Sequence, residues 1–174
     1  MAFVPRYQEA AEPVIVDNIM AVIDRDMKPA LDYFDQQAHG GIVTDNLPGF
    51  AVMTDGAISV FNYPILVLGV QRMGSVETDV IDEGNYLDQT LTVGAGLIVN
   101  DTQSLKKVKE KARKYVRAFK AVIRSAAISD LLPSTARVLN HSIEINHVYL
   151  EPTNKGAEFE QRIAIEIRLK FGES

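Results

Sequence analysis

The sequence has no cysteine among its 174 residues. That absence excludes a disulfide framework, a thiolate metal site and a cysteine nucleophile, and it is compatible with a reducing cytosol. Long hydrophobic runs are absent too, because the longest, such as Ile65–Val70, fall far short of the roughly 20 residues of a membrane-spanning helix. Residues 1–13 show no charged lead followed by an apolar run, so we expect no signal peptide. We expect a soluble protein, made inside a cell, with no membrane partner.

Candidate metal ligands, catalytic nucleophiles and nucleotide-binding motifs are few and scattered along the sequence. His141 and His147 stand six residues apart on one expected strand, about 20 Å at 3.3 Å per residue, so they cannot share a metal within that strand. No serine stands in a G-x-S-x-G elbow. Gly94-Ala95-Gly96 lacks the third glycine of a nucleotide-binding loop, and a bent strand is the better interpretation. We expect no enzyme, no cofactor and no metal site.

The composition is that of a globular domain, with 47% apolar and 24% charged residues. A chain of this length fits one domain and buries roughly 70% of the surface of its unfolded form, which is enough for a core without disulfides. We expect a single domain over residues 1–174, in which residues 1–11 are an N-terminal extension and residues 75–88 an acidic loop.

Two long helices are predicted from apolar residues that recur every 3.6 positions. The first runs from about Glu12 to Gln37, and Pro29 is expected to kink it. The second runs from Asp101 to about Ser129, with competent caps at its start, and would span about 42 Å at 1.5 Å per residue.

Strands are predicted from alternating or continuous apolar runs bounded by turn residues. They are Tyr63–Met73, Gln89–Val99, Val138–Glu151 and Glu158–Phe171, with a short hairpin of Phe50–Thr54 and Ala57–Phe61 around Asp55-Gly56. The last two long strands form a hairpin through residues 152–156. This order predicts an α+β fold: a mostly antiparallel sheet of four to five strands with two long helices packed on one face.

Charge is distributed unevenly along the chain. Residues 102–125 hold nine basic side chains and one acid, a formal charge of +8, whereas the remaining nine basic and 22 acidic residues give −13. The basic residues of the second helix are Lys106, Lys107, Lys109, Lys111, Arg113, Lys114, Arg117, Lys120 and Arg124. The candidate acidic residues of the loop are Glu77, Asp79, Asp82, Glu83 and Asp88. A chain this polarised is able to present opposite charges to different neighbours.

Three interpretations of the basic helix remain open at this point. It is a solvated face, a surface that attracts the phosphates of DNA, or an interface with the acidic loop of a neighbouring copy. Tyr115 and Phe119 fall in the apolar stripe of the helix, so stacking on single-stranded nucleic acid is not expected. The acidic loop matches no calcium-binding pattern, and a solvated loop is the better interpretation of it.

The order of elements resembles a known family. An amphipathic helix precedes a strand reading YPILVLGVQ, then an acidic loop and a strand reading QTLTVGAGLIVND. A long helix, LKKVKEKARKYVRAFKAVIRS, and two long strands follow. Over about residues 10–171 this arrangement is similar to the tail terminator, or tail completion, proteins of tailed bacteriophages. The closest matches are the Tyr-Pro pair at the start of a strand and the tyrosine-containing helix before a closing β-hairpin.

The resemblance implies a structural protein of the virion tail or neck, assembled in the host cytoplasm. Such proteins form a hexameric ring at the head-proximal end of the tail, stop polymerisation of the tail tube and join the tail to the neck of the capsid. The implied partners are copies of the chain itself, the tail tube protein, a neck or head-completion protein and DNA passing through the ring. The family has no catalytic residue and no residue signature to match here.

A ring subunit also agrees with the charge pattern. In a closed head-to-tail ring, one face of each copy meets a different face of the next, and opposite charges on the two faces favour the correct pairing. We therefore expect the basic helix and the acidic loop near subunit or neck interfaces. The alternatives are another neck, head-completion or tail-tube protein, a nucleic-acid-binding module, and an enzyme that uses carboxylates of residues 77–88.

Overall fold

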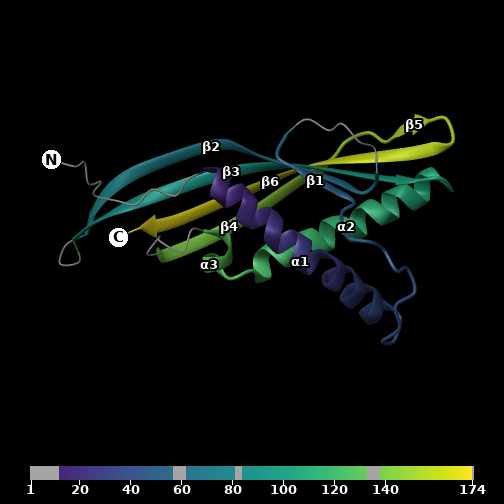
Figure 1. Cartoon of the computed structure of the whole chain (residues 1–174), viewed down its shortest axis with the longest axis horizontal. Helices are drawn as coiled ribbons and strands as arrows, with labels where there is room; N and C mark the ends of the chain where they lie inside the picture. The colour runs from purple at the N-terminus through teal and green to yellow at the C-terminus, as the bar shows by residue number, and fades with distance from the viewer. Residues whose placement is uncertain (1–11, 57–61, 81–83, 133–137, 174) are drawn as a thin grey trace.

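The computed structural model describes residues 12–56, 62–80, 84–132 and 138–173. Its long strands run along the long axis of the molecule, and the helices pack across them (Figure 1). The elements are α1 (Glu12–Ala38), β1 (Val52–Thr54), β2 (Ile65–Val80), β3 (Gly84–Asp101), α2 (Leu105–Ser125), α3 (Ile128–Leu131), β4 (Val138–Tyr149), β5 (Thr153–Lys155) and β6 (Glu158–Glu173).

The strands form one sheet in the order β1-β2-β3-β6-β4, with β5 pairing β6. Every pairing is antiparallel except that of β1 with β2, which is parallel. The predicted fold class, an α+β arrangement with a mostly antiparallel sheet, is confirmed. The described residues contain six strands instead of four to five, because two of them are three-residue pieces added to the four long strands.

One face of the sheet forms the core with the helices. Ile163, Ile165, Ile167 and Leu169 alternate along β6 and are all buried. Residues two apart in a strand share a face, so the intervening positions, which include Glu166 and Arg168 as the sequence predicted, point to the opposite face. The buried residues of β3 and of both long helices belong to the same hydrophobic cluster. Each fully buried aliphatic side chain contributes roughly 1.5–3 kcal/mol.

The first helix agrees with its prediction within one residue, because α1 ends at Ala38 instead of Gln37. Its stripe of Ile15, Ile19, Ile23 and Met27 is buried. These positions recur at helical spacing, which is a local property that a sequence displays directly.

The second helix begins four residues later than predicted. Asp101 is the last residue of β3 and pairs with Phe159 of β6, so its backbone belongs to the sheet. The cap is Ser104, whose Oγ accepts a hydrogen bond from the backbone N–H of Lys107 at 3.2 Å. The helix also ends early, at Ser125, and the separate short helix α3 follows. The 21 residues of α2 span about 31 Å at 1.5 Å per residue, which is shorter than the predicted 42 Å.

The predicted acidic loop is largely a β-hairpin. β2 continues to Val80 and β3 starts at Gly84, with continuous pairing from Ser75 opposite Gln89 to Val80 opposite Gly84. Propensity alone disfavours strands in this acidic stretch, but ladder hydrogen bonds with the neighbouring strand override it. Of the predicted hairpin around Asp55-Gly56, the first strand is present as β1, which pairs in parallel with β2. The other strand of that hairpin, residues 57–61, lies outside the described residues.

Candidate interface surfaces

The basic helix α2 has three distinct sides. One side is buried against the sheet and α1, and includes Val108, Tyr115 and Phe119. The nine basic residues occupy the rest of the helix, as their spacing predicted. They divide further according to whether the chain itself supplies an acidic partner.

One side of α2, with Lys111 and Lys114, is matched by acids from other elements. The Lys111 Nζ lies 3.2 Å from Asp101 Oδ2 and donates a hydrogen bond to the Asn100 carbonyl at 2.8 Å. Lys114 forms an ion pair with Asp45. Such partly exposed pairs contribute up to about 1 kcal/mol each. We call Lys111 and Lys114 the paired side.

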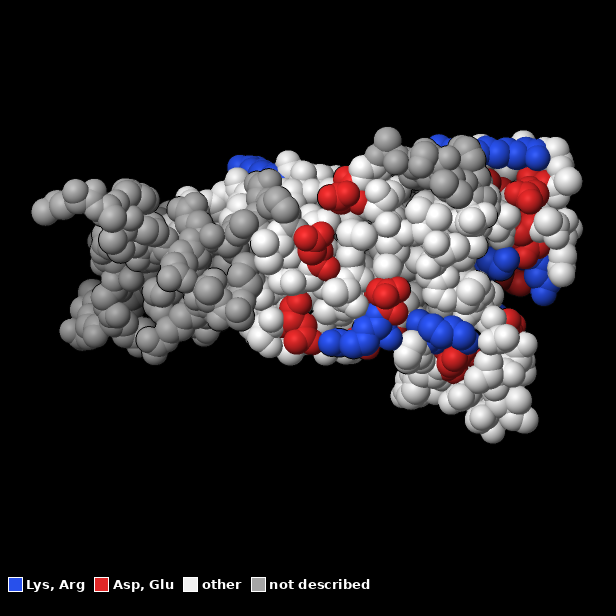
Figure 2. Space-filling model, viewed as in Figure 1, with Lys and Arg blue, Asp and Glu red and all other residues white. Residues whose placement is uncertain are grey.

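Three further basic residues also have neighbours within the chain. Lys106 and Lys107 lie 3.9 and 4.0 Å from the carboxylate of Glu110. The guanidinium of Arg117 lies 4.1 Å from the ring centroid of Phe34 on α1, a cation–π contact. In the view of Figure 2, basic and acidic side chains alternate over the described surface, and neither sign dominates it.

The remaining four cations form a surface that we call the basic flank: Lys109, Arg113, Lys120 and Arg124. Their spacing of four, seven and four residues places them on one side of the helix. None of the four forms an ion pair or hydrogen bond with any residue that the structure describes. Their positive charge is therefore not neutralised by a close partner in this part of the chain.

The basic flank faces strand β4. Burial lowers the pKa of His147 on β4, and the positive charge of Lys120 lowers it further. Burial raises the pKa of Tyr149, which the positive charge of Arg113 opposes. The rings of His147 and Tyr149 pack edge to face with centroids 5.1 Å apart. Both side chains lie on the same face of β4 as the buried Ile145, which is the face toward α2.

β4 is an edge strand of the sheet. It pairs with β6 on one side only, so the backbone groups on its other side have no strand partner among the described residues. Exposed apolar side chains mark its C-terminal end, with Val148 61% and Leu150 47% exposed. Lys109 and Arg113 line a groove of about 210 Å³ with Tyr149 and Leu150. An exposed edge of this kind is a template for pairing with another chain.

The opposite edge of the sheet belongs to β2. β1 covers only Ile65–Val67, so within the described chain the rest of β2 pairs with β3 alone. Val76 on this edge is 67% exposed. Of the predicted acidic residues, Glu77 and Asp79 occupy positions in β2, whereas Asp88 lies in β3. Asp82 and Glu83 lie outside the described residues.

A buried carboxylate joins three segments near the β5–β6 turn, and sequence reasoning missed it. The side chain of Glu160 is 2% exposed and accepts hydrogen bonds from Tyr63 Oη at 2.6 Å, Lys155 Nζ at 2.7 Å and Arg162 Nε at 2.7 Å. Burial alone would raise the pKa of Glu160, but these donors outweigh it and lower the pKa to about 2. Burial and the neighbouring carboxylate raise the pKa of Tyr63 to about 12. This cluster fastens the start of β2 to β6.

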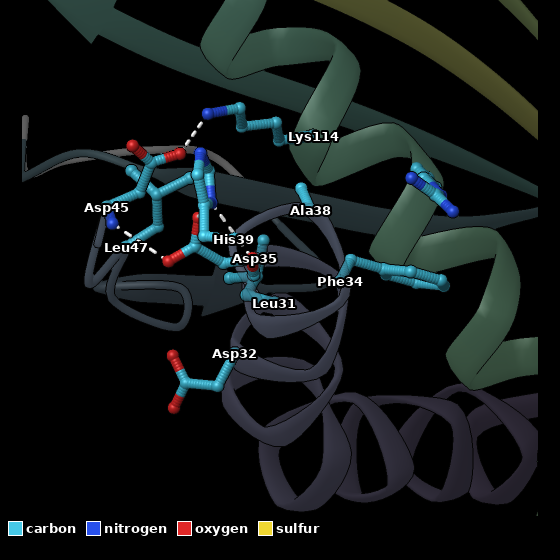
Figure 3. Close-up of a pocket in the computed structure, with 10 residues that line it drawn as sticks. Leu31, Asp32, Phe34, Asp35, Ala38, His39, Asp45, Leu47 and Lys114 are labelled. Carbon is cyan, nitrogen blue, oxygen red and sulfur yellow. Dashed lines mark hydrogen bonds and ion pairs between the residues drawn. The ribbon is translucent and has the colours of Figure 1, made fainter. Parts of the chain in front are cut away.

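A second polar cluster closes the end of α1. The carboxylate of Asp35 accepts hydrogen bonds from the backbone N–H of Asp45 at 2.9 Å and from Thr44 Oγ1 at 3.1 Å. The hydrogen bond from Asp45 is the main reason that the pKa of Asp35 falls to about 2. Figure 3 shows Asp35 beside His39, and Lys114 pointing toward Asp45.

The hollow beside this cluster has a volume of about 100 Å³, well below the roughly 300–1,000 Å³ of ligand pockets. Asp35 of α1 binds Thr44 and Asp45, and Asp45 pairs with Lys114 of α2. The cluster thus holds the connection after α1 against α2.

No group of three His, Asp or Glu side chains in the described part of the chain is placed to hold a metal ion. His141 and His147 both lie on β4, as predicted. Among residues 12–56, 62–80, 84–132 and 138–173, no helix is both long enough and apolar enough to cross a membrane.

No protein-family model matches the sequence, and no curated protein matches it. Among solved structures, the chain has a similarity to a chain from the virion of a native gene transfer agent particle, with 15% sequence identity and a TM-score of 0.38. The alignment covers 86% of this chain and 97% of that chain. A TM-score of this size does not establish a common fold, so the similarity by itself indicates neither a family nor a function.

Proposed function

We propose that this chain is a structural virion protein and not an enzyme. As a subunit of a hexameric ring, it caps the tail tube, stops tube polymerisation and forms the tail side of the head–tail joint. The proposal begins from the resemblance in element order to tail terminator proteins. The described residues have that order: α1, then the β2–β3 hairpin, then α2, then the β4–β6 hairpin.

The observation that carries the proposal is the pair of sheet edges at β4 and β2, which no other strand of the described residues covers beyond Val67. A subunit with two different open edges suits a head-to-tail assembly, in which one surface of each copy meets another surface of the next. Such an assembly closes into a ring when the rotation between copies returns to its start. The proposed partners at the two ends of the ring are the tail tube protein and a neck or head-completion protein.

DNA passing through the ring is the remaining proposed partner. Four cations of α2 have no acidic partner in the described chain, and phosphate attraction needs only such charge. Binding of purified protein to duplex DNA is expected to fall steeply with salt if the basic flank contacts phosphates. Binding that is absent, or insensitive to salt, would remove DNA from the list of partners.

The role as terminator is tested by removing the chain from the particle that contains it. Electron microscopy of particles that lack the chain is expected to show tail tubes of uncontrolled, excessive length. Tails of normal length beside unjoined heads would instead assign the chain to head–tail joining as a connector. Particles with normal tails and joined heads would reject both roles.

A further inference from the structure

The two sheet edges that have no strand partner in the described part of the chain are long. β4 has 12 residues, and β2 extends from the end of its pairing with β1 at Val67 to Val80. Proteins that leave such edges unprotected expose a row of backbone donors and acceptors to other chains. The exposed side chains of Val148 on β4 and Val76 on β2 add apolar surface beside both edges.

Strand direction makes the two edges compatible with each other. The four long strands alternate in direction, because β2–β3, β3–β6 and β6–β4 are all antiparallel. A second copy in the same orientation, set beside β4, therefore presents its β2 antiparallel to that β4. The helices of both copies then cover the same face, and the sheet continues from one copy to the next.

The charges beside the two sheet edges favour one of the three possible edge pairings between two copies. Lys109 and Arg113 of the basic flank line one groove with Tyr149 of β4, whereas Glu77 and Asp79 occupy positions in β2 opposite Leu87 and Asn85. Pairing of β4 with β4 would bring two basic flanks together, and pairing of β2 with β2 would bring two acidic segments together. Only the pairing of β4 with β2 joins opposite charges, and like-charge repulsion disfavours the other two arrangements.

The short strand β1 sets a displacement between copies. Tyr149 lies in one row of the sheet with Ile163, Leu97 and Leu66. In the same row of the next copy, β1 already occupies the edge of β2 at Ile65–Val67. The incoming β4 must therefore shift along β2 toward Val76. That shift also moves the basic flank toward Glu77 and Asp79, so the shape and the charge of the two edges favour the same displacement.

We propose that the free edge of β4, together with the basic flank, binds the free edge of β2 in a second copy of this chain. Copies then join head to tail by continuing one sheet. This inference rests on the proposed ring function and identifies the surfaces through which the ring forms.

The absence of cysteine allows a direct test by cross-linking. Val148→Cys is combined with Arg72→Cys or with Val76→Cys, all on the sheet face away from the helices, and treated with a short bis-maleimide at low salt. Within one chain the paired positions are at least about 19 Å apart, given about 4.8 Å per strand and 3.3 Å per residue, so a short linker reports contacts between copies. A ladder of dimers, trimers and larger species is expected from at least one double variant.

The single variants are the controls for that ladder. Each single variant is expected to give no covalently linked oligomers, because the β4–β2 pairing brings unlike edges together and leaves the single cysteines apart. Dimers from Val148→Cys alone would show β4–β4 pairing and overturn the proposal. Monomers from both double variants would overturn it as well.

A second test reverses the charges. Arg113→Glu with Lys120→Glu is expected to reduce the cross-linked ladder at least tenfold. The matched control is Lys107→Glu with Lys114→Glu, which makes the same change on the side of the helix that carries the paired Lys114 and is expected to leave the ladder intact. Far-UV circular dichroism and thermal melting verify that each variant is folded.

Adding Glu77→Lys and Asp79→Lys to the Arg113→Glu, Lys120→Glu variant is expected to restore the ladder, because the charges are again opposite. Equal losses in the reversed variant and its control would overturn the proposal, as would a folded variant with restored charges that still fails to cross-link. Rings that form without these cross-links would reject this interface but keep the proposed function. Normal tails with joined heads in particles that lack the chain would reject the function and leave the cross-links unaffected.

Discussion

The paired side and the basic flank of α2 carry the same kinds of residue on one helix, yet their surroundings differ. Lys111 and Lys114 have acids supplied by Asp101 and Asp45 from other parts of the chain. Arg113 and Lys120, on the basic flank, face the edge strand β4 and have no ion pair with any described residue. The comparison teaches that a charged helix can hold its own fold together with one side and leave the other side available to a neighbour.

The largest effect is expected from the third side of the same helix. Phe119→Ala removes a ring that is completely buried, and is expected to destabilise the fold by about 3–5 kcal/mol. The midpoint of urea unfolding measures this change. A loss below about 1 kcal/mol would contradict the placement of this side of α2 against the sheet.

A smaller loss of stability, which depends on pH, is expected at Glu160. Its carboxylate is buried and, like Asp45 and Asp101 beside the paired side, forms ion pairs with cations of the chain. Its pKa in the folded chain, about 2, lies below the ordinary value of 4.5, so its carboxylate stabilises the fold above pH 4.5. That contribution, roughly 2–3 kcal/mol, is lost as the pH falls from about 4.5 toward 2. Glu160→Gln is expected to destabilise the protein at pH 7 and to flatten its acid-unfolding curve over that range. Parallel curves for the two proteins would refute this assignment.

The smallest effects separate the two sides of α2 themselves. Lys114→Ala is expected to lower the free energy of unfolding by up to about 1 kcal/mol at low salt, and by less at high salt, because an ion pair is lost and salt screens such pairs. Its matched control, Arg113→Ala on the basic flank, is expected to change the stability by less than about 0.5 kcal/mol. Equal losses from the two substitutions would remove the distinction between these sides.

Much of the fold was predictable because it depends on local periodicity. The buried stripe of α1 and the alternation of Ile163, Ile165 and Ile167 with charged residues along β6 follow from spacing alone. The start of α2 was not predictable in this way. Asp101 is as good a helix cap as Ser104, and only its pairing with Phe159 keeps it in a strand. The sequence predicts a loop at the acidic hairpin for the same reason, because each of its strands is stabilised by pairing with the other.

The sequence by itself determined that α2 is amphipathic, that its exposed surface is basic and that a sheet packs against helices on one face. Side-chain spacing within a few turns or a few strand residues is sufficient for all three. Only the tertiary structure decided which of the nine cations find acidic partners. It also decided that β4 lies at an edge of the sheet, beside the cations of the basic flank. Those outcomes depend on contacts between residues far apart in the chain, such as Lys114 with Asp45 or Ile145 of β4 with Ile167 of β6. The fold determines their distances, and spacing along the sequence does not.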